Sequence, residues 1–396
     1  MRTSEYSEIE GMSAGFWTLV ALLLLILGAG LWAAHVMDSI GHMITGMSNR
    51  VAWGMPHVVA VFLIVAASGA LNAASIASVF GKAAYKPLAR LSGLLAIALL
   101  LGGLTILVLD LGRPDRLGIA MTHYNFRSIF AWNIFLYTGF IAVTGLYLWT
   151  MMERRLNGHT RAVGTVAFLW RLILTTGTGS IFGFLVARQP YDEAIMAPMF
   201  VLMSFSFGLS IFILVLMAAC KGTGRVLGDA ILRRLGNLLG VFTAGVLYFL
   251  LVFHLTKLYE PRFRETEAFI LWNGGIYTFL FWSGAVFLGG VLPMLLVWLP
   301  QTRHSRAALG WGSASVVLGG FALVYLIIIG GQAWPLQIFP GRTVSSSLQD
   351  GSVVDYVPTL IECTLGLGGV AFALLITLFA LKLRPLLPDT LADEPG

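Results

Sequence analysis

The stretch LSGLLAIALLLGGLTILVLDLGRPDRLG, residues 91–118, joins a long apolar run to an abrupt charged end. Its first 19 residues carry no charge, and about 20 apolar residues suffice to cross the core of a bilayer as an α-helix. Pro114 prevents the helix from continuing, because its ring interrupts helical hydrogen bonding. Four charged residues flank this proline: Asp110, Arg113, Asp115 and Arg116. The stretch predicts a transmembrane helix whose polar end either marks the membrane surface or borders a functional site.

The rest of the sequence repeats this pattern. Of its 396 residues 58% are hydrophobic and only 11% are charged, whereas a soluble protein has about 25% charged residues. Ten apolar segments are long enough to cross a bilayer: 14–35, 56–80, 90–110, 128–151, 164–187, 198–220, 236–258, 268–299, 308–330 and 360–382. We therefore predict an all-α polytopic membrane protein, since a membrane β-barrel would show short segments of alternating hydrophobicity.

The distribution of Lys and Arg predicts the orientation of these helices. An even number of spans places both termini on one side, and 15 of the 25 Lys and Arg residues fall on that side, against nine on the other. Cytoplasmic loops carry the excess of positive charge, so both termini are expected in the cytoplasm. The same bias accounts for the net charge of +6 without nucleic-acid binding.

An internal repeat predicts how the spans are grouped. WNIFLYT at Trp132–Thr138 recurs as WNGGIYT at Trp272–Thr278, and the second and sixth spans begin with Pro56 and Pro198. Spans 2–5 and 6–9 are therefore expected to form two tandem four-helix bundles, flanked by helices 1 and 10. The expected units are an N-terminal tail (1–13), a first helix with its periplasmic loop (14–55), bundle A (56–190), bundle B (191–330), a periplasmic loop (331–359), a last helix (360–384) and a C-terminal tail (385–396).

Ionisable side chains gather at the predicted outer ends of the helices. His35, Asp38 and His42 end the first span, and their spacing of three and seven residues would place them on one helical face. Other residues at the same end are His57, Asp110, Arg113, Asn125, Arg127, His254 and Glu362. Charge is costly near the bilayer core, so this gathering indicates a site in the outer half of the membrane with proton access from outside.

Several of these residues also have a purely structural interpretation. An interfacial histidine can be a solvated helix end, Asp110 and Arg113 can form a pair that closes the third span, and Glu362 can cap the last helix. Arg171 and Lys257 are expected to extend their long side chains to the membrane interface.

The sequence offers no thiolate set for a metal centre. It contains only two cysteines, Cys220 and Cys363, and no CxxCH motif, so neither covalently attached haem nor an iron–sulfur cluster is expected. If the protein handles electrons, its metal centres must lie on other subunits.

Several motifs together resemble the NrfD/PsrC-type membrane subunits of redox complexes. DLGRPDR (Asp110–Arg116) is followed by NFRSIFAW (Asn125–Trp132), TGMSNRVAWG (Thr45–Gly54) resembles the first loop of the ten-helix HybB/DsrP branch, and YVPTLIE (Tyr356–Glu362) resembles the start of its last helix. The resemblance covers about residues 30–380. Within it, the second span most resembles DsrP, a subunit of the DsrMKJOP complex.

This resemblance implies a bacterial inner-membrane subunit that exchanges electrons between the quinone pool and a periplasmic ferredoxin-like iron–sulfur subunit. It implies quinone, either menaquinone or ubiquinone, as the cofactor, with no haem or iron–sulfur cluster on this polypeptide. A DsrMKJOP-like complex would add further haem and iron–sulfur partners in sulfur metabolism. Where many relatives carry a histidine in the fifth span, this sequence has Thr178, Gly179 and Ser180, so proton translocation is not carried over.

Quinone chemistry needs hydrogen-bond partners for two carbonyl groups and titratable groups that exchange two protons. We expect the head group at the outer ends of spans 1–4. The candidate catalytic residues are His35, Asp38, His42, Asp110 and Arg113, with Arg113 holding Asp110 ionised. Candidate quinone-binding residues are His35, His42, His57, Asn125, Arg127 and Trp132, and candidate proton-relay residues are Asp38, Asp110, His254 and Glu362.

Two alternatives stay open. The protein could be a membrane anchor that docks an electron-transfer subunit, through the loop 331–359, without binding quinone. It could instead be a secondary transporter, although no broken helix is obvious in the sequence.

Overall fold

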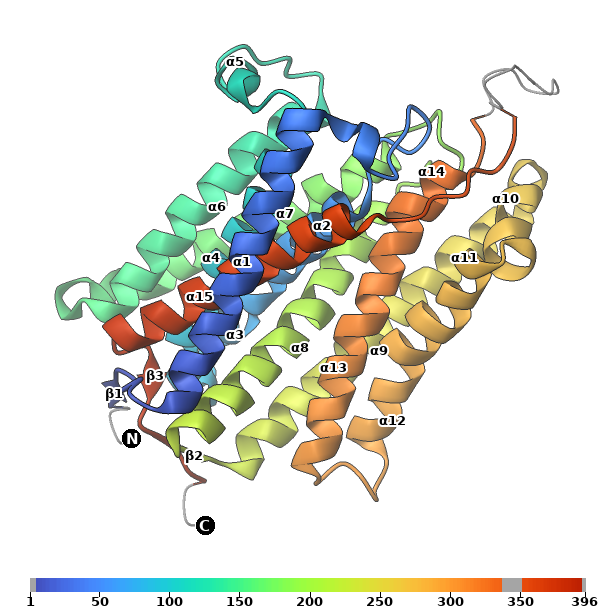
Figure 1. The fold of residues 1–396 in the computed structure, drawn as a ribbon. Coiled ribbons are helices and arrows are strands. Elements are labelled where there is room, and N and C mark those ends of the chain that lie inside the picture. The colour runs from blue at the N-terminus through green and yellow to red at the C-terminus, as the bar shows by residue number, and fades with distance from the viewer. Residues whose placement is uncertain (1–4, 337–350, 394–396) are drawn as a thin grey trace.

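The computed structural model describes residues 5–336 and 351–393, and within these ranges the protein is almost entirely helical. Ten helical segments are long and apolar enough to cross a membrane, which confirms the predicted all-α polytopic class. They run side by side in Figure 1. They are α1 (Ala14–Ile40), α2 with α3 (Met55–Ala70, Asn72–Ser78), α4 (Ala89–Leu109), α6 (Ile129–Met152), α7 (Thr160–Gly183), α8 (Met196–Thr223), α9 (Asp229–Tyr259), an interrupted segment ending in α12 (Leu292–Trp298), α13 (Arg306–Tyr325) and α15 (Leu360–Leu383).

The helices form two rings of four spans. In the first ring α2 packs on α4, α4 on α6, α6 on α7, and α7 on α3; in the second, α8, α9, α12 and α13 follow the same cyclic order. The rings meet along α2 and α8. This position explains why 89% of the most apolar part of the second span is buried, against 17% for α6. Outside the rings, α15 packs on α2 and α4, and α1 packs on α15, as expected for flanking helices.

Glycines allow close helix contacts at two of these interfaces. A Cβ on Gly208 of α8 would lie 2.1 Å from the nitrogen of Ala70, and a Cβ on Gly30 of α1 would lie 2.7 Å from the Cα of Gly368 in α15. Both distances are far below van der Waals contact. Small residues serve this purpose in membranes, where van der Waals packing rather than hydrophobic burial holds helices together.

The second span is broken at Leu71, and Arg171 lies against the break. The guanidinium Nη1 of Arg171 donates to the carbonyl oxygen of Ser68 at 3.0 Å and to Oδ1 of Asn72 at 2.6 Å. Only 3% of Arg171 is exposed. The expectation that Arg171 reaches the membrane interface is therefore wrong, because the interrupted helix provides acceptors inside the bundle.

The eighth span is also broken, contrary to expectation. It begins as α10 (Arg264–Ala268), continues through a π-helical turn and α11 (Ile276–Phe279), and contains a second π-helical stretch, Leu280–Val291, before α12. Gly275 has φ 57° at the interruption, a conformation that glycine adopts without steric cost. Glycine is frequent in unbroken transmembrane helices as well, so the Gly–Gly pair alone did not reveal the break.

The first helix is longer than predicted and ends in a sharp turn. It runs to Ile40, and Gly41 then adopts φ 90° before a short 3₁₀ turn that begins at His42. His35 and Asp38 are exposed on α1, whereas His42 lies beyond the turn. The predicted helical face shared by His35, Asp38 and His42 is therefore wrong, because the backbone changes direction at Gly41.

Both ends of the described polypeptide lie at one end of the bundle, called here the terminal end (Figure 1). The strand β1 (Tyr6–Ser7) pairs antiparallel with β3 (Leu387–Pro388). The strand β2 (Val226–Leu227), between α8 and α9, pairs in parallel with β4 (Thr390–Leu391). Which membrane side this end faces stays a prediction, as do the domain boundaries. Residues 337–350 of the loop predicted as a dock, 331–359, lie outside the described ranges.

Candidate functional site

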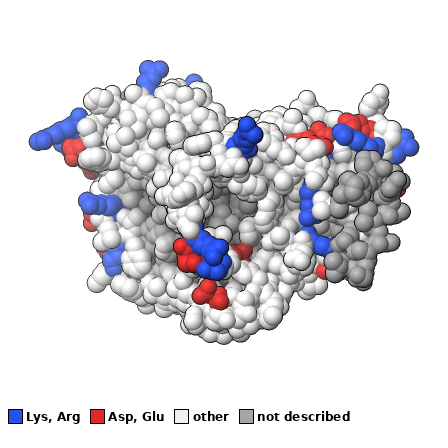
Figure 2. All heavy atoms as spheres, turned by 90° about the horizontal axis from the view of Figure 1, so that it is seen from above, with Lys and Arg blue, Asp and Glu red and all other residues white. Residues whose placement is uncertain are grey.

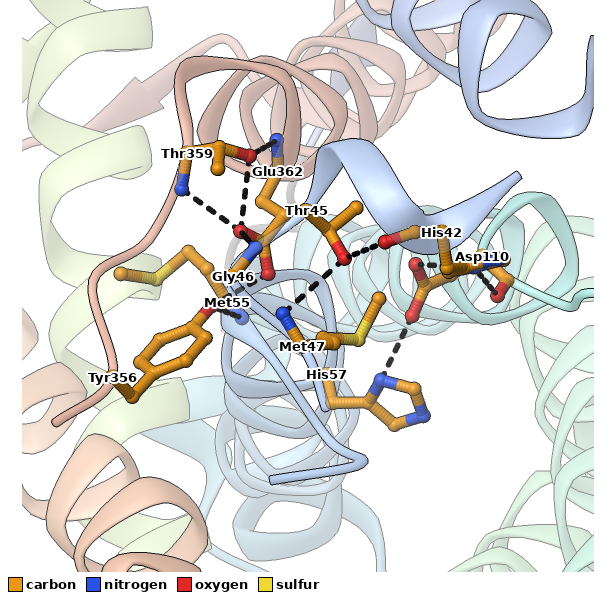
Figure 3. A network of polar contacts seen from close by, with 10 residues as sticks. All are labelled: His42, Thr45, Gly46, Met47, Met55, His57, Asp110, Tyr356, Thr359 and Glu362. Atoms are coloured by element: carbon orange, nitrogen blue, oxygen red, sulfur yellow. Dashed lines mark hydrogen bonds and ion pairs between the residues drawn. The ribbon is translucent and has the colours of Figure 1, made fainter. Parts of the chain in front are cut away.

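Asp110 lies at the opposite end of the bundle, called here the site end, where three chain segments meet (Figure 3). It follows the last residue of α4, and its side chain is 1% exposed. His57, in the first turn of α2, places Nδ1 2.9 Å from Oδ2 of Asp110. His42 places Nε2 3.7 Å from Oδ1 and 3.0 Å from the backbone carbonyl oxygen of Asp110. The carboxylate thus lies between two histidines from different segments.

This carboxylate is buried without hydrogen bonds. Within the described residues, neither oxygen of Asp110 nor Nδ1 of His57 has a hydrogen bond of favourable geometry, although the two groups are close enough for an ion pair. Buried polar atoms almost always have a hydrogen-bond partner, and a buried carboxylate without one is costly. Both oxygens of Asp110 therefore keep a capacity to accept hydrogen bonds that no described residue uses.

Aromatic rings border the same histidine. Trp53 stacks on His57 with 6.3 Å between ring centroids, and it makes edge contacts with Phe130 of α6 at 6.0 Å and Phe182 of α7 at 5.9 Å. Flat apolar rings favour stacked and edge contacts with other aromatic rings. These rings form an apolar aromatic border beside His57.

Glu362 fastens the loop that carries His42. Its Oε2 accepts hydrogen bonds from the backbone nitrogens of Gly46 at 2.9 Å and Thr359 at 2.8 Å, the latter completing a capping box at the start of α15. Its Oε1 accepts from the hydroxyl of Tyr356 at 2.6 Å, and that hydroxyl accepts from the nitrogen of Met55 at 2.7 Å. Burial raises the pKa of Tyr356, as does the carboxylate of Glu362 that accepts its hydrogen bond. Figure 3 shows how Glu362, Tyr356 and Thr359 are joined by these contacts.

A second set of contacts holds Trp53 from the other bundle. The backbone nitrogen of Trp53 donates to Oε1 of Gln332 at 3.0 Å, and Nε2 of Gln332 donates to the carbonyl oxygen of Trp53 at 2.9 Å. Arg188 donates to the carbonyl oxygens of Gln332 and Arg50, at 2.9 and 3.1 Å. The aromatic side of the site is therefore positioned by residues that follow both bundles.

The structure brings together only some of the predicted residues. His42, His57 and Asp110 meet, whereas His35 and Asp38 are exposed on α1. Arg113 is 63% exposed and forms a two-pronged ion pair with Asp115, at 3.0 and 2.9 Å, which lowers the pKa of Asp115. The expectation that Arg113 holds Asp110 ionised is wrong, because Pro114 turns Arg113 towards the aspartate beyond it.

Three predicted quinone-binding residues lie on the surface near α6. Asn125 and Arg127 are exposed, and Oδ1 of Asn125 accepts from the backbone nitrogen of Arg127 at 3.1 Å. Trp132 is 45% exposed and donates to the carbonyl oxygen of Phe126. In the described part of the protein none of the three hydrogen-bonds with Asp110. Their predicted contact with a head group stays a prediction.

His254 belongs to a separate buried cluster in the second bundle. Its Nδ1 lies 2.6 Å from Oε2 of Glu267, a residue that is 1% exposed. Lys257 is fully buried, donates to the carbonyl oxygen of Gln189 and lies 4.3 Å from the ring centre of Phe263. The expectation that Lys257 extends to the interface is wrong, because a backbone carbonyl and aromatic faces satisfy it inside the protein.

Sequence reasoning missed Trp53, Tyr356, Gln332 and Glu267. Trp53 and Tyr356 lie inside motifs quoted above, so their neighbourhood was visible although their contacts were not. Gln332 contacts Trp53 across 279 residues, and no local pattern indicates such a pairing. Glu267 lies only 13 residues after His254, and this short spacing between ionisable residues was the one available signal.

The fold and the site together indicate a polytopic membrane protein of two four-helix bundles. It carries a histidine–carboxylate site at one end of these bundles. Residues 43–335 match the family described as polysulphide reductase, NrfD. The match covers well over half of the sequence, and the protein therefore belongs to this family.

Named relatives resemble the protein over most of its length. The Hdr-like menaquinol oxidoreductase integral membrane subunit of Archaeoglobus fulgidus is 28% identical over 396 residues, covering 98% of both sequences. The putative dimethyl sulfoxide reductase membrane subunit of Halobacterium salinarum is also 28% identical and covers 93% of this sequence and 91% of the relative. The menaquinone reductase integral membrane subunit of Nitratidesulfovibrio vulgaris is 22% identical and covers 94% of this sequence and 92% of the relative.

Proposed function

We propose that the protein is the quinol-interacting membrane subunit of a respiratory redox complex and that the Asp110 site binds the quinol head group. The observation that carries the proposal is the buried carboxylate of Asp110, which lies between two histidines without a hydrogen bond and beside the ring of Trp53. The names of two relatives mention menaquinol or menaquinone, which favours menaquinol as the substrate.

The geometry supports a separate role for the Asp110–His57 pair and for His42. Oxidation of a quinol releases two electrons and two protons. Asp110 and Nδ1 of His57 are 2.9 Å apart and would meet one hydroxyl group, with Asp110 accepting its hydrogen bond. His42 contacts Asp110 and is 31% exposed, so it would pass protons towards water. Histidine is suited to this transfer because its imidazole ring can both accept and donate a proton.

The partners and the orientation belong to the same proposal. The electrons would pass to a ferredoxin-like iron–sulfur subunit docked on the site end, which would face the periplasm while both termini lie in the cytoplasm. Figure 2 looks onto this end and shows separate groups of charged side chains around a largely uncharged, hollowed face. The finer assignment to a DsrP-like complex of sulfur metabolism, with haem subunits, rests on the resemblance of the second span alone.

The test is the Asp110→Asn variant in the purified complex, with dimethylnaphthoquinol as electron donor. We expect turnover to fall by about 100-fold or more, the usual contribution of a group that takes part in proton transfer. Asp115→Asn is the matched control, because Asp115 follows in the same loop but is exposed. Unchanged turnover and quinol affinity of the Asp110→Asn complex, with assembly intact, would contradict the proposal and favour an anchor without a quinol site.

The interrupted helices favour the transporter alternative. Broken helices are common at transporter binding sites, and the second and eighth spans are both broken. Substrate uptake by vesicles containing this protein alone would support that function.

A further inference from the structure

A cavity of about 220 Å³ lies at the terminal end, remote from the Asp110 site. It is open to one side and is lined by the start of α9, the end of α12 and the start of α13, which lie together in Figure 1. Its polar lining includes Arg233, Asn237, Thr302, Arg303, His304 and Arg306. Nothing in the proposed quinol chemistry uses these residues.

The cavity carries excess positive charge. Its lining includes three arginines and one acidic residue, Asp229. Arg306 donates from Nε to Oδ1 of Asp229 at 2.7 Å and from Nη2 to the carbonyl oxygen of Leu227, so this pair is balanced. The charges of Arg233 and Arg303 remain uncompensated by the lining. Guanidinium groups match the geometry of phosphate oxygens and bind them with two parallel hydrogen bonds.

The start of α13 adds to this charge. The helix has 20 residues and begins at Arg306, and the hydroxyl of Ser305 caps it by accepting from the nitrogen of Ala308 at 3.2 Å. The first N–H groups of a helix carry partial positive charge and favour a nearby anion. The cap residue itself lines the cavity.

The remaining lining is apolar, and exposed tryptophans follow it closely in the sequence. Leu232, Leu296 and Leu309 line the cavity. The neighbouring tryptophans, Trp298 at the end of α12 and Trp311 near the start of α13, are 41% and 72% exposed. Exposed tryptophans are enriched where transmembrane helices meet the lipid head groups. The cavity therefore combines an anion-binding rim with apolar walls at the head-group level.

We propose that this cavity binds the head group of an acidic phospholipid. The phosphate would lie between Arg233 and Arg303, and the acyl tails would run along the apolar surface beside Leu296 and Trp311. A basic pocket between helices is typical of sites for anionic lipid head groups. A soluble anion would use the arginines but not the apolar walls.

The experiment measures lipid binding to the purified complex by native mass spectrometry, with phosphatidylglycerol, phosphatidylcholine and inorganic phosphate as separate probes. We expect phosphatidylglycerol to bind and phosphatidylcholine to bind at least tenfold more weakly. The double variant Arg233→Gln/Arg303→Gln should weaken phosphatidylglycerol binding by about 30-fold, the change expected from losing two cations near a membrane surface. Arg234→Gln is the matched control, because Arg234 is the next residue of α9 but does not line the cavity.

Each outcome decides the proposal. Equal affinity of the wild-type complex for the two lipids would overturn it, and so would unchanged phosphatidylglycerol binding by the double variant. Displacement of the lipid by millimolar inorganic phosphate would show a general anion site and would also overturn it. The comparison of lipids on the wild-type complex tests the proposal even if the double variant does not assemble.

Discussion

At the scale of single residues, the Glu362 carboxylate has two possible roles. It can relay protons, or it can act as a structural fastener that holds the loop of His42 by hydrogen bonds. Its two oxygens accept hydrogen bonds from Gly46, Tyr356 and Thr359, and the residue is fully buried. These contacts hold the loop of His42 to the start of α15. The sequence predicted a cap as one of two alternatives, since Glu362 lies at the start of the last span; the structure adds Thr359 as the partner in a capping box.

Substitution of Glu362 separates the two roles. Glu362→Gln keeps one carbonyl acceptor, so we expect turnover within about threefold of wild type and little change in Tm. Glu362→Ala leaves several buried donors without an acceptor and should destabilise the protein by about 2–4 kcal/mol. The measurements are Tm and dimethylnaphthoquinol turnover. If Glu362→Gln kept its Tm but lost turnover as Asp110→Asn does, Glu362 would be a relay and not a fastener.

Residue identities at the site were partly predictable. The sequence placed His42, His57 and Asp110 at one end of three helices, and the structure brings them together. It could not exclude His35 and Asp38, because the apolar pattern does not show where the first helix ends. Only the backbone at Gly41, with φ 90°, decides which of these side chains reaches Asp110.

At the scale of elements, the contact between α1 and α15 depends on the close approach of Gly30 and Gly368. A small separate cluster of buried side chains, including Val20 and Leu375, accompanies this contact. Because α1 leads directly to His42, the position of this helix also sets one side of the site. The packing of a flanking helix therefore affects the position of His42.

Gly30→Val tests this dependence. Its side chain would collide with the backbone of Gly368, so we expect α1 to separate from α15, with a lower Tm and turnover reduced by about tenfold or more. The control is Gly28→Val, because a Cβ on Gly28 has no neighbour within 4 Å. Similar Tm and turnover in both variants would show that the α1–α15 contact does not position His42.

The number and class of the elements were predictable, but their interruptions were not. Long apolar runs identified all ten spans. The repeated WN-x₃-YT motif also fell at the same end of the fourth and eighth spans, yet its two copies differ locally. Trp132–Thr138 lies inside the continuous helix α6, whereas Trp272–Thr278 spans the break at Gly275. Sequence likeness indicated position in the fold and not backbone conformation.

At the scale of the whole molecule, the two bundles contact each other directly, and residues from both position the site. They meet where Gly208 of α8 packs on the backbone of α2. Gln332 and Arg188, which follow helices of different bundles, both bind the loop next to Trp53. The Asp110 site lies at the end of the first bundle, but its aromatic side also depends on Gln332, which follows the second.

Gly208→Val should disrupt the contact between the bundles. The new Cβ would lie 2.1 Å from the nitrogen of Ala70, a backbone atom that cannot move aside. We expect a loss of at least about 3 kcal/mol in stability, as for overpacking at a rigid contact, seen as a lower Tm and less monodisperse protein in size-exclusion chromatography. Gly222→Val on the same helix is the control, since its Cβ meets no atom within 4 Å. Equal behaviour of the two variants would contradict a rigid interface at Gly208.

The pairing of α1 with α15 also has a consequence for biosynthesis. About 320 residues separate the end of α1 from the start of α15, and at about 5–20 residues per second the ribosome needs roughly 15 s to a minute to make them. During that interval the glycine face of α1 lacks its main partner, α15. Its other faces remain exposed in the finished protein, with Leu22, Leu24 and Leu25 at 52%, 51% and 72% exposure. Because these faces are apolar, α1 is compatible with lipid contact before α15 is inserted. The loop that carries His42 can be fastened only after the last helix has been inserted.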